Sequence, residues 1–206
     1  MRIAVVGGTG AFGTALARRL VTAGEEVVIG SRDAERARQT AQEIGAAGGE
    51  DNARAVVDAD LVVLAVKAEA IVQTGAALAR AIGTTPVLCV GAELLFSRDG
   101  VRPASDARSV AERLAEGVRA PVVAGLHSLA AATLSGEAAP DEDALVCGDD
   151  AKAKGLALEV AGKLVAGRAL DAGPLAGARA LEGMTAVIVN LNRRYKAHAG
   201  IRVTGV

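Results

Sequence analysis

Three glycines near the start of the chain have the spacing of a dinucleotide-binding turn. Gly8, Gly10 and Gly13 form the pattern Gly-x-Gly-x-x-Gly between a short apolar run and a helical repeat of apolar residues. The first glycine of such a pattern allows a tight turn, the second lets backbone N–H groups approach a pyrophosphate, and the third lets helix and strand pack closely. The turn, with Ala11 and Phe12, is therefore predicted to bind a dinucleotide at the helix N-terminus.

The end of the next apolar run indicates which dinucleotide is bound. NAD sites place Asp or Glu there against the ribose 2′-hydroxyl, whereas NADP sites offer Arg to the 2′-phosphate. This chain has Ser31 and Arg32 at that point, and Arg36 follows on the first turn of the next predicted helix. Asp33 is better placed as the N-cap of that helix. The pattern favours NADP; the alternative is that Arg32 and Arg36 are solvated surface charges.

Composition and charge exclude several other classes of protein. The formal net charge is −1 and only three residues are aromatic, so neither a basic footprint nor a stacking platform for nucleic acid is present. Cys89 and Cys147 lie 58 positions apart in apolar runs, as buried reduced thiols usually do, and no disulfide or metal site is expected. The aliphatic stretch 61–66 is far shorter than the roughly 20 residues of a membrane span. We expect a soluble, cytoplasmic protein.

Apolar runs alternate with helical patterns along the chain, which predicts an α/β fold: a doubly wound Rossmann-type parallel sheet with a small C-terminal α/β lobe. We expect residues 1–125 to form the NADP-binding domain and residues 126–206 the smaller lobe. In that lobe Asp149 is expected to cap a helix, and a last helix is expected from Pro174 to about Asn192. The strands are predicted at 1–6, 26–30, 61–66, 86–90, 121–124, 145–147 and 168–170, with helices between them that include 68–82 and 107–116.

Two familiar catalytic arrangements are missing. Short-chain dehydrogenases need Tyr-x-x-x-Lys, but the only tyrosine, Tyr195, is followed four positions later by Ala199. The related hydroxyacid dehydrogenases need Lys and Asn one helical turn apart, and none of Lys152, Lys154 and Lys163 has Asn at that distance. No general acid or base is evident. This indicates a hydride transfer that needs little proton chemistry from side chains.

A set of sequence blocks extends over nearly the whole chain. The blocks are Gly7-Gly8-Thr9-Gly10, Ile29-Gly30-Ser31-Arg32, Asn52-Ala53, Val146-Cys147-Gly148-Asp149-Asp150 and Leu170-Asp171-Ala172-Gly173-Pro174-Leu175, followed by Arg179, Glu182 and Asn190. Together they resemble the NADPH-dependent reductases of the 5-deazaflavin coenzyme F420, the F420:NADP oxidoreductases. The resemblance implies that a hydride passes between C4 of the nicotinamide and C5 of a deazaflavin stacked against it, so that the protein supplies positioning and exclusion of water.

The resemblance also implies which residues hold each ligand. Thr9, Ser31, Arg32 and Arg36 would hold NADP(H). His127 would face the cleft at the end of a strand, where ligands of such sheets bind; the alternative is a satisfied structural role. A homodimer is expected. The residues expected beside F420 are His127, Gly173, Pro174, Leu175, Arg179 and Thr185.

Two stretches differ from the pattern of that family. Lys67, which follows Val66, stands where proline is usual, and Val90-Gly91-Ala92-Glu93 replaces a proline-containing loop that borders the deazaflavin. Val66 and Lys67 are candidate cofactor contacts, although a lysine at a strand end can also simply be solvated. Two alternatives stay open: an NADPH-dependent reductase of another flavin-like or small carbonyl substrate, and a non-catalytic NADP-binding sensor.

One local cluster of basic residues lies near the end of the chain. Arg193, Arg194 and Lys196 are close in sequence, and the segment 176–206 carries five Lys and Arg side chains against one acidic side chain. The anionic tail of a deazaflavin, with its phosphate and carboxylates, would be attracted there. The alternative is a basic helix end that complements its own dipole.

Overall fold

The computed structural model describes residues 1–206. It contains one eight-stranded sheet with the order β10-β9-β8-β5-β4-β1-β2-β3 and a separate hairpin of β6 and β7. The strands of the sheet are β1 Arg2–Val6, β2 Glu26–Ser31, β3 Gly48–Asp51, β4 Leu61–Leu64, β5 Val87–Cys89, β8 Val122–Gly125, β9 Ala144–Gly148 and β10 Ala169–Asp171, and the hairpin pairs β6 Leu94–Phe96 with β7 Val101–Pro103.

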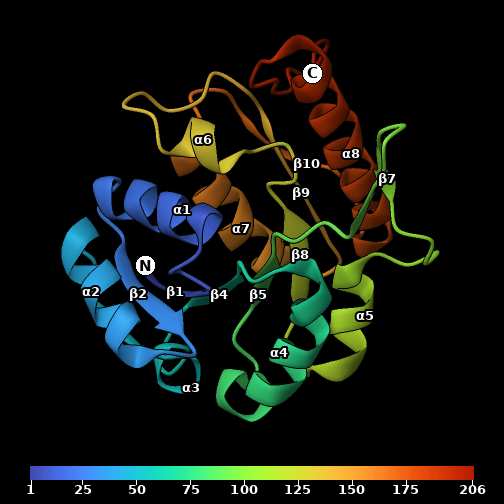
Figure 1. The fold of residues 1–206 in the computed structure, drawn as a ribbon. Coiled ribbons are helices and arrows are strands. Elements are labelled where there is room, and N and C mark those ends of the chain that lie inside the picture. Colours follow the sequence, from blue (N-terminus) through green and yellow to red (C-terminus); the bar gives the residue numbers. More distant parts are fainter.

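Helices cover both faces of this sheet (Figure 1). One core packs β1, β2 and β4 against α1, α2 and α7, and includes Leu16, Ala41 and Val160. The other packs the opposite face against α4, α5 and α8, and includes Ile71 and Leu114. The helices are α1 Ala11–Thr22, α2 Ala34–Ile44, α3 Asn52–Ala55, α4 Ala68–Ile82, α5 Val110–Gly117, α6 Ala131–Leu134, α7 Ala151–Leu164 and α8 Ala178–Tyr195, preceded by the 3₁₀ turn η1 Leu175–Gly177.

Six strands run parallel in the order β3-β2-β1-β4-β5-β8. This is the doubly wound arrangement, in which the strand order reverses direction between β1 and β4 and ligands bind outside the carboxyl ends of the strands at that point. We call this the C-terminal edge of the sheet. The predicted α/β class and Rossmann-type sheet are confirmed.

Strand β9 reverses direction. It pairs antiparallel with β8, so that Val123 lies opposite Gly148, and β10 then runs parallel to β9. The carboxyl ends of β9 and β10 therefore lie at the edge opposite to the C-terminal edge. Because both strands extend the main sheet, residues 126–206 build on the same sheet as residues 1–125.

Several elements lie outside the predicted set or differ from it in detail. Strand β3, α3, α6 and the β6–β7 hairpin were not predicted. The prediction that Asp149 caps the helix was wrong. The side chain of Asp150 caps α7 and accepts from Ala153 N at 2.8 Å, whereas Asp149 Oδ1 accepts from Leu175 N at 3.0 Å. The predicted helix 107–116 begins only after Ser109, whose side chain caps α5. None of the helices is long and apolar enough to cross a membrane.

Candidate functional site: a cleft at the C-terminal edge

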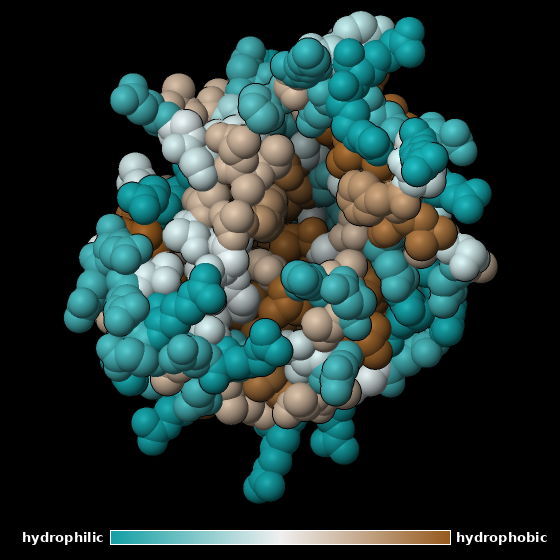
Figure 2. Space-filling model, viewed as in Figure 1, coloured by the Kyte–Doolittle hydropathy of each residue, from teal (hydrophilic) through white to brown (hydrophobic).

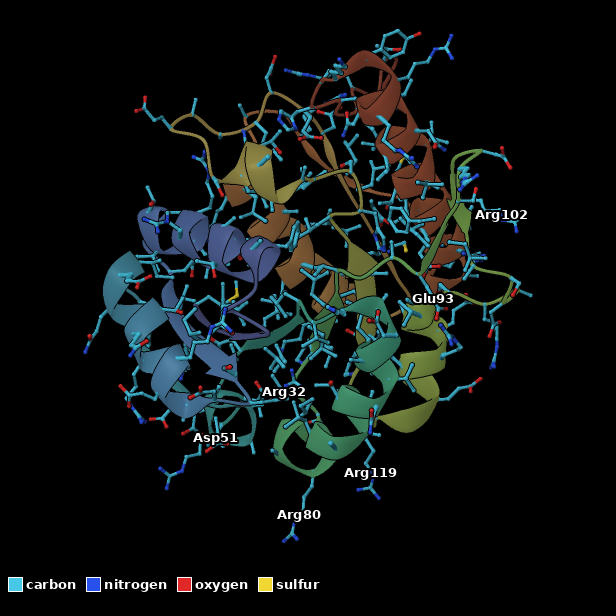
Figure 3. All side chains as sticks on the ribbon, viewed as in Figure 1. Arg32, Asp51, Arg80, Glu93, Arg102 and Arg119 are labelled. Atoms are coloured by element: carbon cyan, nitrogen blue, oxygen red, sulfur yellow. The ribbon has the colours of Figure 1, made fainter.

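A cleft of about 900 Å³ lies where β1, β2 and β4 end. It brings together seven of the residues predicted to contact a dinucleotide, which are Thr9, Gly10, Ser31, Arg32, Arg36, Val66 and Lys67. Figure 3 shows Arg32 between the β2–α2 region and α4. In the space-filling view the same face of the molecule is hollowed at its centre, with apolar residues at the bottom of the hollow (Figure 2).

The glycines of the turn differ in whether the protein leaves room for a side chain. A Cβ on Gly8 would lie 2.8 Å from Val5 O, and one on Gly13 would lie 2.4 Å from Gly7 O, so both positions are closed to larger residues by the protein itself. A Cβ on Gly10 would meet only Gly7 O, at 3.4 Å. Gly10 is the N-cap of α1 and is exposed. Its missing side chain leaves open space where a ligand can approach the backbone.

The remaining predicted residues of the turn lie around this cleft rather than on its lining. Gly8 and Gly13 are buried beneath the turn, and Phe12 is half-buried and packs on the core of α1 and β1. Ala11 lines a second cavity, described below.

Hydroxyl groups and arginines meet at the end of β2. Ser31 Oγ lies 3.4 Å from Thr9 Oγ1 and accepts a hydrogen bond from Asp33 N at 3.2 Å. Arg36 Nη2 donates to Thr9 O at 3.3 Å, which ties α2 to the glycine turn. Arg32 and Arg36 are exposed and take part in no ion pair, so the Arg32 guanidinium and the remaining N–H groups of Arg36 can bind an anion.

Asp33 borders the cleft, but one oxygen of its carboxylate is already used to cap a helix. Its Oδ1 accepts from Glu35 N at 3.0 Å and from Arg36 N at 3.1 Å, which makes it the N-cap of α2 as predicted. The end of β2 therefore presents two cations and a serine hydroxyl, which is the chemistry that a 2′-phosphate requires.

The opposite wall of the cleft comes from α4 and was missed by the sequence reasoning. Lys67 is the N-cap residue of α4, with no side-chain capping bond, and it is exposed. The additional lining residues are Gly7, Asp33, Asn52, Ala65, Glu69, Ala70, Gln73, Thr74, Ala77 and Leu78. The exact prediction of helix 68–82 after a strand could have signalled this wall, because the first turns of a helix that follows a parallel strand lie at the C-terminal edge.

A second cavity of about 570 Å³ lies between α1 and α6, and Thr9 borders both cavities. Its α6 wall is held by Arg19 of α1. The Arg19 guanidinium donates to Leu134 O at 2.9 Å, Glu137 O at 3.3 Å and Gly136 O at 2.5 Å, and also contacts Ala138 O. One side chain thus fixes the segment after α6 against the helix that begins at the glycine turn.

His127 follows β8 at the C-terminal edge but is buried, with 6% of its surface exposed, and does not line the cleft. Leu126 has φ of 65°, which turns the chain out of the strand just before it. His127 Nε2 lies 3.2 Å from Gly91 O, and since a carbonyl only accepts, Nε2 carries the proton. Nδ1 is buried without a partner. Burial lowers the pKa of His127 to about 4, so the ring is neutral at pH 7.

Arg179 and Thr185 of α8 are engaged within the protein. Thr185 Oγ1 donates to His127 O at 2.8 Å, which joins the middle of α8 to the end of β8. Arg179 Nη1 donates to Glu182 Oε2 at 2.8 Å and Nη2 contacts Ala104 O. Glu182 is buried, accepts from Val110 N at 2.7 Å, and has a pKa raised by burial.

Gly173, Pro174 and Leu175 lie away from the cleft. They follow β10, whose carboxyl end lies at the opposite edge because β9 and β10 are reversed relative to β8. Gly148 N donates to Gly173 O at 3.0 Å, and Leu175 is buried in the core of α5 and α8. The sequence pattern contains no signal for this reversal, so it could not place these three residues.

Comparison with known proteins identifies relatives over the full chain. Residues 2–89 match the family model of NADP oxidoreductase, coenzyme F420-dependent. The chain is 35% identical to the F420-dependent NADP reductase of Methanothermobacter thermautotrophicus, with 100% of this chain and 96% of that protein covered. It is 32% identical to the enzyme of the same name from Methanocaldococcus jannaschii, with 100% and 99% covered.

Solved structures agree with this relationship. A crystal structure of a candidate F420-dependent NADP reductase from Arthrobacter sp. FB24 has a TM-score of 0.86 and 25% identity, with 100% of each chain covered. An imine reductase from Streptomyces aurantiacus, at 21% identity and a TM-score of 0.65 over 95% of this chain and 62% of that chain, shares the fold. The full-length identity to the curated enzymes shows that the chain belongs to the family of F420-dependent NADP reductases.

Proposed function

We propose that this protein is an oxidoreductase that transfers a hydride between NADP(H) and coenzyme F420. One observation carries the proposal. In a member of the F420-dependent NADP reductase family, Arg32, Arg36 and Ser31 meet at the end of β2, beside the open backbone of Gly10, and the acid that follows Arg32, Asp33, caps α2.

The cleft fits NADP(H) by two independent features. The space over Gly10 would take the pyrophosphate against the N-terminus of α1, a 12-residue helix whose first N–H groups have no partners within the helix. Arg32 and Arg36 would hold the 2′-phosphate, with Ser31 and Thr9 as hydroxyl partners. When bound, NADP(H) supplies or accepts the hydride at C4 of its nicotinamide.

The contribution of the protein to the chemical step is orientation and exclusion of water. His127 is neutral at pH 7 and buried, so it is suited to position the wall of the site rather than to donate a proton. Of the residues expected beside F420, His127 and Thr185 are the pair at the C-terminal edge, and we propose that they border the deazaflavin ring.

A second candidate substrate is kept because of Lys67. Its ammonium group is exposed at the lining of the cleft and forms no ion pair. A cation at this position suits the carbonyl oxygen or anionic group of a small substrate as well as it suits a deazaflavin. We therefore retain, as the alternative, an NADPH-dependent reductase of another flavin-like or small carbonyl substrate.

We also propose that the protein is a homodimer in which residues 1–125 bind NADP(H) and residues 126–206 complete the site. Val187, Leu191 and Tyr195 recur every fourth residue on α8 and are 58%, 40% and 68% exposed, which makes an apolar stripe without a partner in the monomer. Such a stripe is a reasonable contact between two copies. Light scattering at micromolar concentration tests the dimer, and a monomeric mass would contradict it.

The activity itself is tested by one absorbance assay. The protein is mixed with NADPH and F420, and the visible absorbance of the oxidised deazaflavin is followed; the assay is then repeated with free flavin and with small aldehydes and imines. Loss of the F420 absorbance, with saturation in both substrates, supports the proposal. Turnover with only flavin or a carbonyl compound would support the second candidate, and NADPH binding without any turnover would support a sensor.

A further inference from the structure

Five cations without acidic partners are concentrated at one end of the molecule. They are carried by the β6–β7 hairpin and by the C-terminal end of α8, and we call them the cationic end: Arg98, Arg102, Arg193, Arg194 and Lys196. All five are exposed and none takes part in an ion pair, whereas Arg113, Arg179 and Arg202 each form one. The hairpin and residues 183–196 carry one acid, Asp99.

The two segments that carry these cations are fastened to each other. Asn190 of α8 accepts from Val101 N at 2.8 Å and donates to Val101 O at 2.7 Å, so its amide replaces a strand partner for β7. Arg193 Nη1 lies 3.5 Å from Ser97 O at the turn of the hairpin. The cations from both segments therefore form one surface, and their mutual repulsion is a cost that the fold itself does not offset.

The helix dipole does not account for this arrangement. Basic side chains at the end of α8 complement the partial negative charge of its last carbonyl groups, which explains Arg193, Arg194 and Lys196. Arg98 and Arg102 lie on the hairpin, outside any helix, and gain nothing from that dipole. Their presence beside the helix end points to an anion that comes from outside the chain.

The cationic end lies within reach of the proposed reaction site. Thr185, in the middle of α8, is bonded to the backbone of His127 at the C-terminal edge of the sheet. At a rise of about 1.5 Å per residue, Arg193 lies about 12 Å further along the helix. Figure 1 shows α8 running outward from the sheet beside the hairpin. A ligand whose ring lies beside His127 and Thr185 can thus reach the cationic end with an extended side chain.

We propose that the cationic end binds the anionic side chain of the deazaflavin substrate, that is, the phosphate and carboxylate groups remote from the ring that takes the hydride. This inference rests on the proposed function. The ring-binding and nucleotide-binding residues set the chemistry, and the cationic end sets the preference for a deazaflavin with a polyanionic tail over the same ring without one.

The experiment compares two substrates that share one ring: F420, and a truncated deazaflavin that lacks the phosphate and the carboxylates. The variant Arg98→Glu/Arg194→Glu reverses two cations that form no hydrogen bond in the structure. The control Arg80→Glu/Arg119→Glu reverses two unpaired arginines that Figure 3 shows at the far side of the molecule. We expect kcat/KM for F420, divided by that for the truncated substrate, to fall roughly tenfold in the first variant and to stay within twofold in the control.

Salt and a neutral variant complete the test. Wild-type preference for F420 over the truncated substrate should shrink between about 0.05 and 0.5 M salt, because exposed charges are screened. Arg98→Gln/Arg194→Gln should show a smaller fall in the same ratio, and its fold is at no risk from charge reversal. An unchanged ratio in both variants, with both substrates turned over, would overturn the inference while leaving the proposed function intact. Loss of a wild-type dimer with an unchanged ratio would assign the surface to a second copy instead. Absence of turnover with either deazaflavin would overturn the proposed function itself.

Discussion

Substitution by alanine should have different effects at two glycines of the same turn: it should lower the stability of the protein at Gly13 and weaken NADPH binding at Gly10. At Gly13 an added Cβ would lie 2.4 Å from Gly7 O and 2.9 Å from Gly8 Cα, and neither backbone atom can move without distorting the turn. Overpacking of this kind costs up to about 3 kcal/mol, while alanine in a helix gains about 1 kcal/mol over glycine. Gly13→Ala should therefore lower the free energy of unfolding by about 2 kcal/mol, or Tm by roughly 4 to 8 °C for a chain of this size.

At Gly10 the same Cβ fits the free protein. Its nearest neighbour would be Gly7 O at 3.4 Å, and φ of −84° with ψ of 160° is open to any residue. Alanine is a poorer N-cap than glycine, which costs about 0.5 kcal/mol. Gly10→Ala should melt within about 2 °C of the wild type, yet its Kd for NADPH should rise at least roughly tenfold, because the methyl group occupies the approach to the pyrophosphate.

Thermal unfolding and calorimetric titration of NADPH into both variants separate the two effects. Each variant serves as the control for the other, since both add one methyl group to one motif. Wild-type affinity in Gly10→Ala would refute the location of the pyrophosphate, and a wild-type Tm in Gly13→Ala would refute the packing argument.

Three further predictions concern charged and buried groups. Arg32→Ala should raise the Kd for NADPH roughly tenfold to a hundredfold, about 1.5 to 3 kcal/mol, and leave NADH binding unchanged; equal losses for both cofactors would contradict a 2′-phosphate contact. His127→Ala should lower kcat/KM for F420 by about one to two orders of magnitude without removing a limb of the profile between pH 5 and 9, because burial lowers the His127 pKa to about 4; a lost limb near pH 6.5 would identify a proton donor instead. Glu142 is 4% exposed, and burial raises its pKa to about 7, so the stability it contributes is present below pH 4.5 and is lost as pH rises through 7. Between pH 5 and 8.5 the Tm of the wild type should therefore fall relative to the Tm of Glu142→Gln. If plots of Tm against pH were parallel for the two proteins, this linkage would be excluded.

The parts of the fold that could be predicted are those whose side chains are set by burial. The apolar run 61–66 predicted a strand, of which residues 61–64 form β4, and the predicted helix 68–82 agrees with α4 in both bounds. Strand β3, by contrast, reads Gly48-Gly49-Glu50-Asp51 and has no apolar pattern. It exists because its backbone pairs with β2, and a Cβ on Gly49 would meet Ala37 C at 2.2 Å, so α2 crosses it in direct contact.

The nucleotide half of the candidate site was predicted better than the deazaflavin half for a similar reason. The alternation of strands and helices predicts that β1 and β2 end side by side. Their ends therefore bring together Thr9, Ser31 and Arg36. The position of Gly173 depends on the direction of β9, and the direction of a strand cannot be read from its amino-acid composition. The clamp of Arg19 on Leu134 O joins residues 115 positions apart and has no local signal.

The strand order has a consequence for synthesis of the chain. Residues 1–89 supply β3, β2, β1, β4 and β5 as one uninterrupted row, so this part of the sheet can pair before any later strand has been made. The later strands join this row at β5, whose three residues are fully buried in the finished protein. At about 5 to 20 residues per second, the ribosome needs on the order of seconds to add the residues up to the end of β8. During that interval an apolar strand edge is exposed to other nascent chains, and this is the stage at which a chaperone would protect the protein most.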